Sequence, residues 1–179
     1  NSSSKDMANW LLTWINGGKF NGKEIIPANY LYQAMTPQMV TGAGLPAGEN
    51  KDVFFGTYGF AWGMSSYRGH YRVEHGGGID GFITSTGFFP ADSIGIFVVS
   101  SQSGPTTAIR NFIADRMLGL SYRNWSKQQL DAIAKEKLAA TTVHNNPDSS
   151  NRKPNTKPSH DIKDYAGIFE NPGYGQAKL

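Results

Sequence analysis

The chain has no cysteine among its 179 residues. It therefore has no disulfide framework and no thiolate metal site, and this absence fits an oxidising and a reducing compartment equally well. Long apolar runs are also missing, and no segment has the roughly 20 apolar residues that a membrane-spanning helix needs. The start, Asn1-Ser2-Ser3-Ser4, has neither an initiator methionine nor a signal-peptide pattern, so we expect that something upstream has been removed.

Neither basic nor acidic residues are in large excess. The chain has 17 basic and 14 acidic residues, and many of the basic ones fall between residues 126 and 163 without interleaved aromatics. This pattern does not predict a nucleic-acid surface. A content of 39% hydrophobic and 17% charged residues is typical of a globular protein, and 21 glycines indicate many turns. The length allows one domain, or one domain and a piece of another.

Three helices are predicted in the first 120 residues. The first has apolar residues at helical spacing between Met7 and Ile15, a serine cap before them and a glycine pair after them. The second begins at Pro27 and stops at Pro37. The third covers residues 106–118, and we expect Ile109, Phe112 and Met117 among the residues it buries.

Four runs rich in aromatic and β-branched residues predict strands. They cover residues 58–64, 71–75, 82–89 and 94–101, and residues 40–52 before them are predicted as a loop. The short links between the runs favour an antiparallel meander. The predicted fold class is α+β, an antiparallel sheet flanked by helices.

The remainder of the chain is more polar. Residues 126–140 are compatible with a helix, 141–159 resemble a linker, and the segment from Tyr165 to Gly175 predicts a short β-hairpin. We therefore divide the chain into a helix-and-sheet portion at 1–122, a helix and polar linker at 123–160, and the start of a small β domain at 161–179.

The most informative segment is His75-Gly76-Gly77-Gly78 at the end of a predicted strand. Glycines there allow a substrate backbone to lie close to the strand and leave an N–H free to point at a developing oxyanion. A flexible glycine-rich bend explains the same residues from local sequence alone.

Other chemistries fit this region less well. The spacing Gly76-x-Gly78-x-x-Gly81 matches a dinucleotide fingerprint, but a strand follows it in place of the helix that would hold a pyrophosphate. A metal site is not predicted, because His70 and His75 would point to opposite faces of one strand. Asp80 is interpreted as a turn residue and Asp115 as an exposed helical charge.

Taken together, these segments resemble the C-terminal part of the serine β-lactamase-like and penicillin-binding-protein-like hydrolases. The opening Asn1 to Leu11 looks like the capped helix that follows the second catalytic motif of the family. Residues 58–63, Tyr-Gly-Phe-Ala-Trp-Gly, are similar to the start of its C-terminal strands. His75-Gly76-Gly77 takes the place of its third motif, Lys-Thr-Gly or His-x-Gly. The resemblance covers about residues 1–120. It implies that residues 1–122 are the C-terminal portion of a catalytic domain and that residues 161–179 begin an accessory β domain.

The resemblance implies roles for these residues. The third-motif strand, with Gly76 and Gly77 as substrate-binding positions, edges the substrate channel. Gly78 gives an N–H to the oxyanion hole, and His75 replaces the family's lysine in contact with substrate or leaving group. The family's nucleophile is the serine of a Ser-x-x-Lys, which is expected upstream. Ser2-Ser3-Ser4-Lys5 spells this pattern, but we interpret it as a helix cap and first turn.

From this resemblance we expect a fragment of an acyl-enzyme serine hydrolase that acts on ester, amide (D-amino-acid peptide) or β-lactam bonds. A small-molecule or peptide acyl substrate is expected, with no cofactor, no metal, no nucleic acid and no membrane span in this chain. Family analogy implies a periplasmic or secreted location. Two alternatives remain open at this point: a non-catalytic penicillin-binding-like module, and a purely structural piece.

Overall fold

The computed structural model describes residues 2–42, 45, 51–101, 104–144 and 155–179. The predicted loop at 40–52 and the predicted linker at 141–159 therefore lie partly outside the described residues. Contacts within the chain define two units, residues 1–135 and residues 136–179, which we describe separately.

Helix α1 (Ser4–Ile15) begins where the sequence predicts. The Ser3 side chain caps it by accepting a hydrogen bond from the Asp6 N–H at 3.2 Å. One face of the helix buries Leu11 and Trp14. A small hairpin of β1 (Lys19–Phe20) and β2 (Lys23–Glu24) follows, and then α2 (Ala28–Ala34), for which Pro27 is the N-cap residue.

Six antiparallel strands form the sheet, and their spatial order is their chain order. They are β3 (Met39–Gly42), β4 (Val53–Tyr58), β5 (Gly63–Tyr67), β6 (His70–Ile79), β7 (Phe82–Phe89) and β8 (Ile94–Ser100). The predicted meander and the α+β class are confirmed.

Two of the predicted boundaries before β6 are wrong. The run at 58–64 is not one strand, because the chain turns between Tyr58 and Gly63, and the Gly59 N–H donates to the Trp62 carbonyl across that turn. Ala61 there has φ +63°, in the left-handed region that interrupts a strand. The start of the predicted loop forms strand β3, which pairs with β4.

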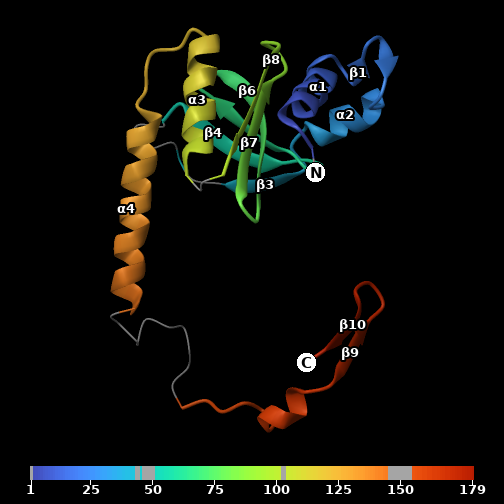
Figure 1. Cartoon of the computed structure of the whole chain (residues 1–179), viewed down its shortest axis with the longest axis vertical. Helices are drawn as coiled ribbons and strands as arrows, with labels where there is room; N and C mark the ends of the chain where they lie inside the picture. Colours follow the sequence, from blue (N-terminus) through green and yellow to red (C-terminus); the bar gives the residue numbers. More distant parts are fainter. Residues whose placement is uncertain (1, 43–44, 46–50, 102–103, 145–154) are drawn as a thin grey trace. The chain divides into compact units, whose positions relative to one another are not determined.

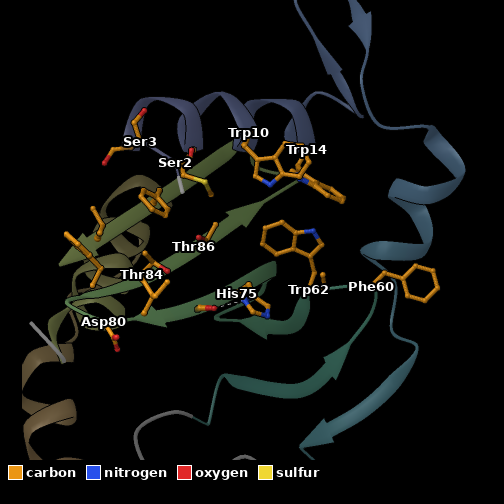
Figure 2. Close-up of a pocket in the computed structure, with 18 of the residues that line it drawn as sticks. Ser2, Ser3, Trp10, Trp14, Phe60, Trp62, His75, Asp80, Thr84 and Thr86 are labelled. Atoms are coloured by element: carbon orange, nitrogen blue, oxygen red, sulfur yellow. Dashed lines mark hydrogen bonds between the residues drawn. The ribbon is translucent and has the colours of Figure 1, made fainter. Parts of the chain in front are cut away.

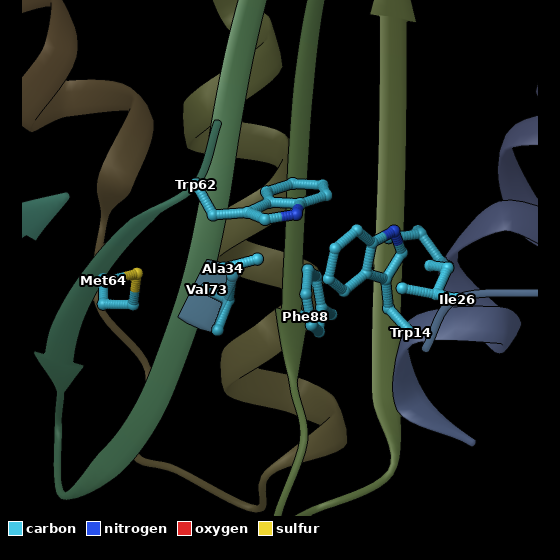
Figure 3. Packing of buried hydrophobic residues seen from close by; sticks show 8 residues of the cluster. Trp14, Ile26, Ala34, Trp62, Met64, Val73 and Phe88 are labelled. Carbon is cyan, nitrogen blue, oxygen red and sulfur yellow. The ribbon is translucent and has the colours of Figure 1, made fainter. Parts of the chain in front are cut away.

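Helices cover both faces of the sheet (Figure 1). Consecutive strand residues point to opposite faces, so Phe88 packs on the side of α1 and α2 while Phe89 packs on the side of α3 (Pro105–Met117). On the first side, Trp14 and Trp62 pack around Phe88 (Figure 3). The second side contains Tyr67, which is completely buried.

The face of α3 that meets the sheet is more polar than the sequence predicts. Ile109, Phe112 and Met117 are exposed, contrary to expectation, and the buried positions include Arg110 and Asn111. The interpretation of Asp115 as an exposed charge is also wrong, because it is 3% exposed.

The buried Asp115 carboxylate has three partners. It accepts hydrogen bonds from the Tyr67 hydroxyl at 2.7 Å and the Trp125 indole at 2.6 Å, and it pairs with Arg68 at 2.8 Å. Burial, together with the bond to Asp115, raises the pKa of Tyr67, so its hydroxyl stays a donor. These bonds join α3, the β5–β6 turn and the start of α4 (Trp125–His144).

The second unit contains a short 3₁₀ helix, η3 (Ile162–Tyr165), and a hairpin of β9 (Ile168–Asn171) and β10 (Gly175–Lys178). The predicted hairpin is confirmed, while its assignment to an accessory domain stays a prediction. Within the described part of the chain, every helix is too short or too polar to cross a lipid bilayer.

Candidate functional site

The glycine run continues strand β6 and does not form a flexible bend. Gly76, Gly77 and Gly78 pair with residues 85, 84 and 83 of β7, and the hairpin turns at Asp80-Gly81, where Gly81 has φ +81°. On its other side β6 pairs with β5 only up to Glu74. From His75 onward, no described strand covers that edge.

The register decides which backbone groups face this open edge. Ile79 and Phe82 flank a two-residue turn, so their backbone groups form a hydrogen-bonded pair. Hydrogen-bonded and non-hydrogen-bonded pairs alternate along an antiparallel ladder, so the N–H and C=O groups of Gly78 and Gly76 point away from β7. Tyr67 and His70 flank the two-residue turn between β5 and β6, and counting along β6 from this pair also places the backbone groups of the even-numbered residues on the β5 side. Gly78 thus presents an N–H along the open edge, as an oxyanion donor requires.

His75 lies at the start of the open edge, on the face of the sheet that α1 and α2 cover. Its Nδ1 is 2.5 Å from the Gly76 carbonyl oxygen, and its Nε2 is 3.0 Å from the Tyr58 hydroxyl oxygen. A carbonyl can only accept, so Nδ1 carries a hydrogen. In the neutral ring Nε2 is then the acceptor and the Tyr58 hydroxyl is the donor.

The β4–β5 turn places two aromatic side chains beside this histidine. The Trp62 and His75 rings meet edge to face, with centroids 6.5 Å apart. A Cβ at Gly59 would collide with the Ala34 carbonyl oxygen, so α2 packs directly on the turn. This close approach fixes the turn that carries Phe60 and Trp62.

A cavity of about 1140 Å³ opens over the same face of the sheet. Figure 2 shows His75 and Trp62 on one side of it and Ser2 and Ser3, at the start of α1, on another. Thr84 and Thr86 of β7 also line the cavity.

Behind the open edge, on the α3 face, is a group of buried charges. The Glu74 carboxylate pairs with Arg72 at 2.7 Å and with Arg110 of α3, and both arginine side chains are more than 90% buried. Burial lowers the pKa of Arg72, and the Glu74 charge opposes that effect. Glu74 therefore joins α3 to β6 one residue before His75.

The predicted site residues are found on one strand. His75 and Gly76 line the cavity, while Gly77 and Gly78 follow along the same strand edge. Ser3 is the cap of α1, as interpreted, and Lys5 is exposed. Sequence reasoning did not identify Tyr58, Phe60 and Trp62 as site residues. The only sequence feature that pointed to these three residues was their position in the segment 58–63, which resembles the start of the family's C-terminal strands.

His70 and His75 have separate partners. The His70 Nδ1 lies 3.0 Å from the Asp92 carboxylate, and His75 bonds to Tyr58. Within the described residues, no three His, Asp or Glu side chains gather as metal ligands would.

The described core is thus a six-stranded antiparallel sheet with helices on both faces and a histidine-glycine segment along the open edge of β6. Residues 1–119 match the family model described as Beta-lactamase, so the chain belongs to the beta-lactamase family.

Two known proteins are similar to part of the chain. The chain is 27% identical, over 131 residues, to the unguisins hydrolase ungD of Aspergillus violaceofuscus (strain CBS 115571), covering 68% of this chain and 23% of that protein. It resembles the octameric penicillin-binding protein homologue from Pyrococcus abyssi with a TM-score of 0.55 and 21% identity, covering 67% of this chain and 25% of that one. The chain thus spans about a quarter of the length of each relative.

Proposed function

We propose that these residues form one wall of the active site of an acyl-enzyme serine hydrolase. The substrate would be an ester, an amide such as a D-amino-acid peptide, or a β-lactam. The observation that carries the proposal is the open edge of β6, where the register directs the Gly78 N–H outward beside His75. An N–H held by a sheet is preorganised to stabilise a tetrahedral oxyanion.

In this proposal the nucleophile is a serine that precedes residue 1 in the natural protein. Its hydroxyl attacks the substrate carbonyl, and the Gly78 N–H donates to the oxyanion that forms. The tetrahedral intermediate collapses by cleavage of the ester C–O or amide C–N bond, and the leaving oxygen or nitrogen takes up the proton that the serine hydroxyl lost; in a β-lactam the amine stays attached to the acyl group. Water then hydrolyses the acyl-serine to a carboxylic acid and the free serine. His75 contacts the substrate or the leaving group, and the Tyr58 hydroxyl orients its ring.

The test labels the natural protein with a fluorophosphonate, which reacts with activated serines. Peptide mass mapping then locates the modified residue, and the intact mass and N-terminal sequence give the extent of the chain. We expect one modified serine outside residues 1–179. Modification of Ser2, Ser3 or Ser4 would contradict the assignment of the nucleophile.

A non-catalytic binding module is the second candidate. The observation that favours it is the cavity itself, whose aromatic walls could hold a ligand without any nucleophile. Absence of labelling in the intact natural protein, together with retained ligand binding, would support this candidate over the hydrolase.

An exported location, periplasmic or secreted, belongs to the same proposal by analogy with the family. Cell fractionation with an antibody to residues 1–179 tests it.

A further inference from the structure

Strand β6 is held differently before and after Glu74. From His75 to Ile79, the only described strand beside it is β7, and β7 is itself paired with β8 along residues 83–89. The positions of the His75 ring and of the Gly78 N–H therefore depend on how firmly the start of this segment is fixed to β7 and to the helix behind it.

The Arg110 side chain of α3 contacts both strands at this point. Its Nη1 donates a hydrogen bond to the Thr86 carbonyl oxygen at 3.1 Å, and its Nη2 pairs with the Glu74 carboxylate. Thr86 lies directly opposite His75, and Glu74 immediately precedes His75. Because a guanidinium group is planar and presents its donors in a fixed arrangement, one side chain sets the position of β6 relative to β7 at the histidine.

The Thr86 carbonyl also belongs to the strand ladder. By the alternation that starts at Ile79 and Phe82, His75 and Thr86 form a hydrogen-bonded pair, so this oxygen accepts a bond from the His75 N–H as well. A carbonyl oxygen has two lone pairs and can accept both bonds. The His75 backbone and the Arg110 guanidinium are thus joined through one oxygen atom.

A glycine makes room for Arg110 over the sheet. Gly87 lies opposite Glu74, and a Cβ on Gly87 would come within 2.9 Å of the Arg110 Cδ. The Arg110 side chain is 6% exposed. Arg72 binds the other oxygen of Glu74 and donates to the Ser65 hydroxyl at 3.2 Å, which extends the group to β5. These bonds lie inside the core on the α3 face, so they do not depend on what else borders the cavity on the opposite face.

We propose that Arg110 is the positioning residue of this active-site wall. Through the Thr86 carbonyl and the Glu74 carboxylate it holds His75 at the start of the open edge and keeps the Gly78 N–H aligned with the oxyanion. The sheet separates Arg110 from the cavity, so it acts through the strand and not on the substrate. The inference rests on the proposed function, because it assigns the group that orients the same site.

Two arginine variants test this role. We would measure the rate constant for labelling of the natural protein by a fluorophosphonate, whose phosphoryl oxygen takes the place of the substrate carbonyl oxygen, at matched folded fractions. Arg110→Met should slow labelling by roughly 10- to 100-fold, because a small displacement of a preorganised donor costs much of the rate. Arg68→Met is the matched control. The Arg68 side chain is 7% exposed and pairs with Asp115 and Asp52 at the other end of β6, so its loss should leave the labelling rate of the folded protein unchanged.

A second pair of variants displaces Arg110 without removing its charge. Gly87→Ala pushes the side chain away from the Thr86 carbonyl, whereas Gly95→Ala makes an equally close contact, also 2.9 Å, with Ile15 on the other face of the sheet. We expect slower labelling in Gly87→Ala than in Gly95→Ala. Equal rates within the glycine pair, or within the arginine pair, would overturn the inference and leave the proposed function standing.

Hydrogen exchange separates the inference from the proposed function. If the fluorophosphonate labels no serine of the natural protein, the proposed function fails, and the exchange of backbone amides then tests the anchor by itself. Arg110→Met should speed exchange of the His75 and Gly77 amides, which face β7, more than exchange in β8, whereas a general loss of stability would change both strands equally. A local increase supports the inference, and an equal change in both strands overturns it.

Discussion

The Tyr58 hydroxyl lies 3.0 Å from Nε2 of His75, although 17 residues separate them in the chain. The meander of β4, β5 and β6 brings them together. The other ring nitrogen of His75, Nδ1, donates a hydrogen bond to the Gly76 carbonyl. The imidazole is thus fixed at both nitrogens at the start of the open strand edge.

The first prediction concerns this bond. Tyr58→Phe removes the hydroxyl and should lower kcat/KM, while the free energy of unfolding changes by less than about 1 kcal/mol because the bond is exposed. A double-mutant cycle with His75→Ala measures the coupling. If the hydroxyl acts through the imidazole, the double variant is no slower than His75→Ala alone. Additive losses would mean that Tyr58 acts independently of His75.

The second prediction concerns Glu74. Glu74→Gln leaves two buried guanidinium groups facing a neutral amide, and we expect the free energy of unfolding to fall by about 2–4 kcal/mol. Urea denaturation measures this change. Asp131→Asn is the control, since it removes the partner of Lys127 in an exposed pair and should cost less than about 0.5 kcal/mol. Equal effects from the two variants would show that Glu74 contributes no more than a surface charge.

Much of the fold could be predicted because its signals are local. The cap and apolar spacing of α1, the short links of the meander and the strand runs all lie within a few residues of one another. Where local chemistry was misleading, tertiary contacts decided the structure. The aromatic run at 58–64 continues through a turn that exists because Gly59 packs on the backbone of α2.

The inward face of α3 and most of the site depend on partners distant in the chain. Arg110 and Asp115 are buried because the sheet offers Glu74 and Tyr67 opposite them, and helical periodicity contains no such information. His75 and the glycines could be found from sequence, since they form one motif. Tyr58 could not be paired with His75 before the register of three strands was known.

The third prediction uses two glycines with different surroundings. A Cβ on Gly76 would meet only the Thr84 carbonyl oxygen, at 3.5 Å, so Gly76→Ala should leave the free energy of unfolding within about 1 kcal/mol of its original value. Strand alternation directs the added methyl group to the α3 face, as it does the Glu74 side chain and away from His75, so we expect hydrolysis to change little as well. Gly59→Ala collides with α2 backbone and should destabilise by about 1–3 kcal/mol or more. A large loss of hydrolysis in Gly76→Ala, without loss of stability, would contradict this orientation of the strand.

The fourth prediction concerns the acid dependence of stability. The hydrogen bond from Arg123 lowers the pKa of Asp52, and the charges of Arg123 and Arg68 act in the same direction, whereas partial burial opposes them. A carboxyl whose pKa is lower in the folded state binds fewer protons there than in the unfolded chain. Its stabilising contribution is therefore complete above the ordinary Asp pKa of about 3.9 and is lost as the pH falls toward the lower, folded value.

Urea midpoints measured between pH 6 and pH 2 test this dependence. Asp52→Asn should lower the midpoint at pH 6, and the difference from the original protein should shrink steadily below about pH 4. The effect at pH 6 should be modest, because the Asp52 side chain is 39% exposed and water screens its ion pairs. A difference that stays constant down to pH 2 would mean that Asp52 stabilises the fold through packing or hydrogen bonding that does not require its charge.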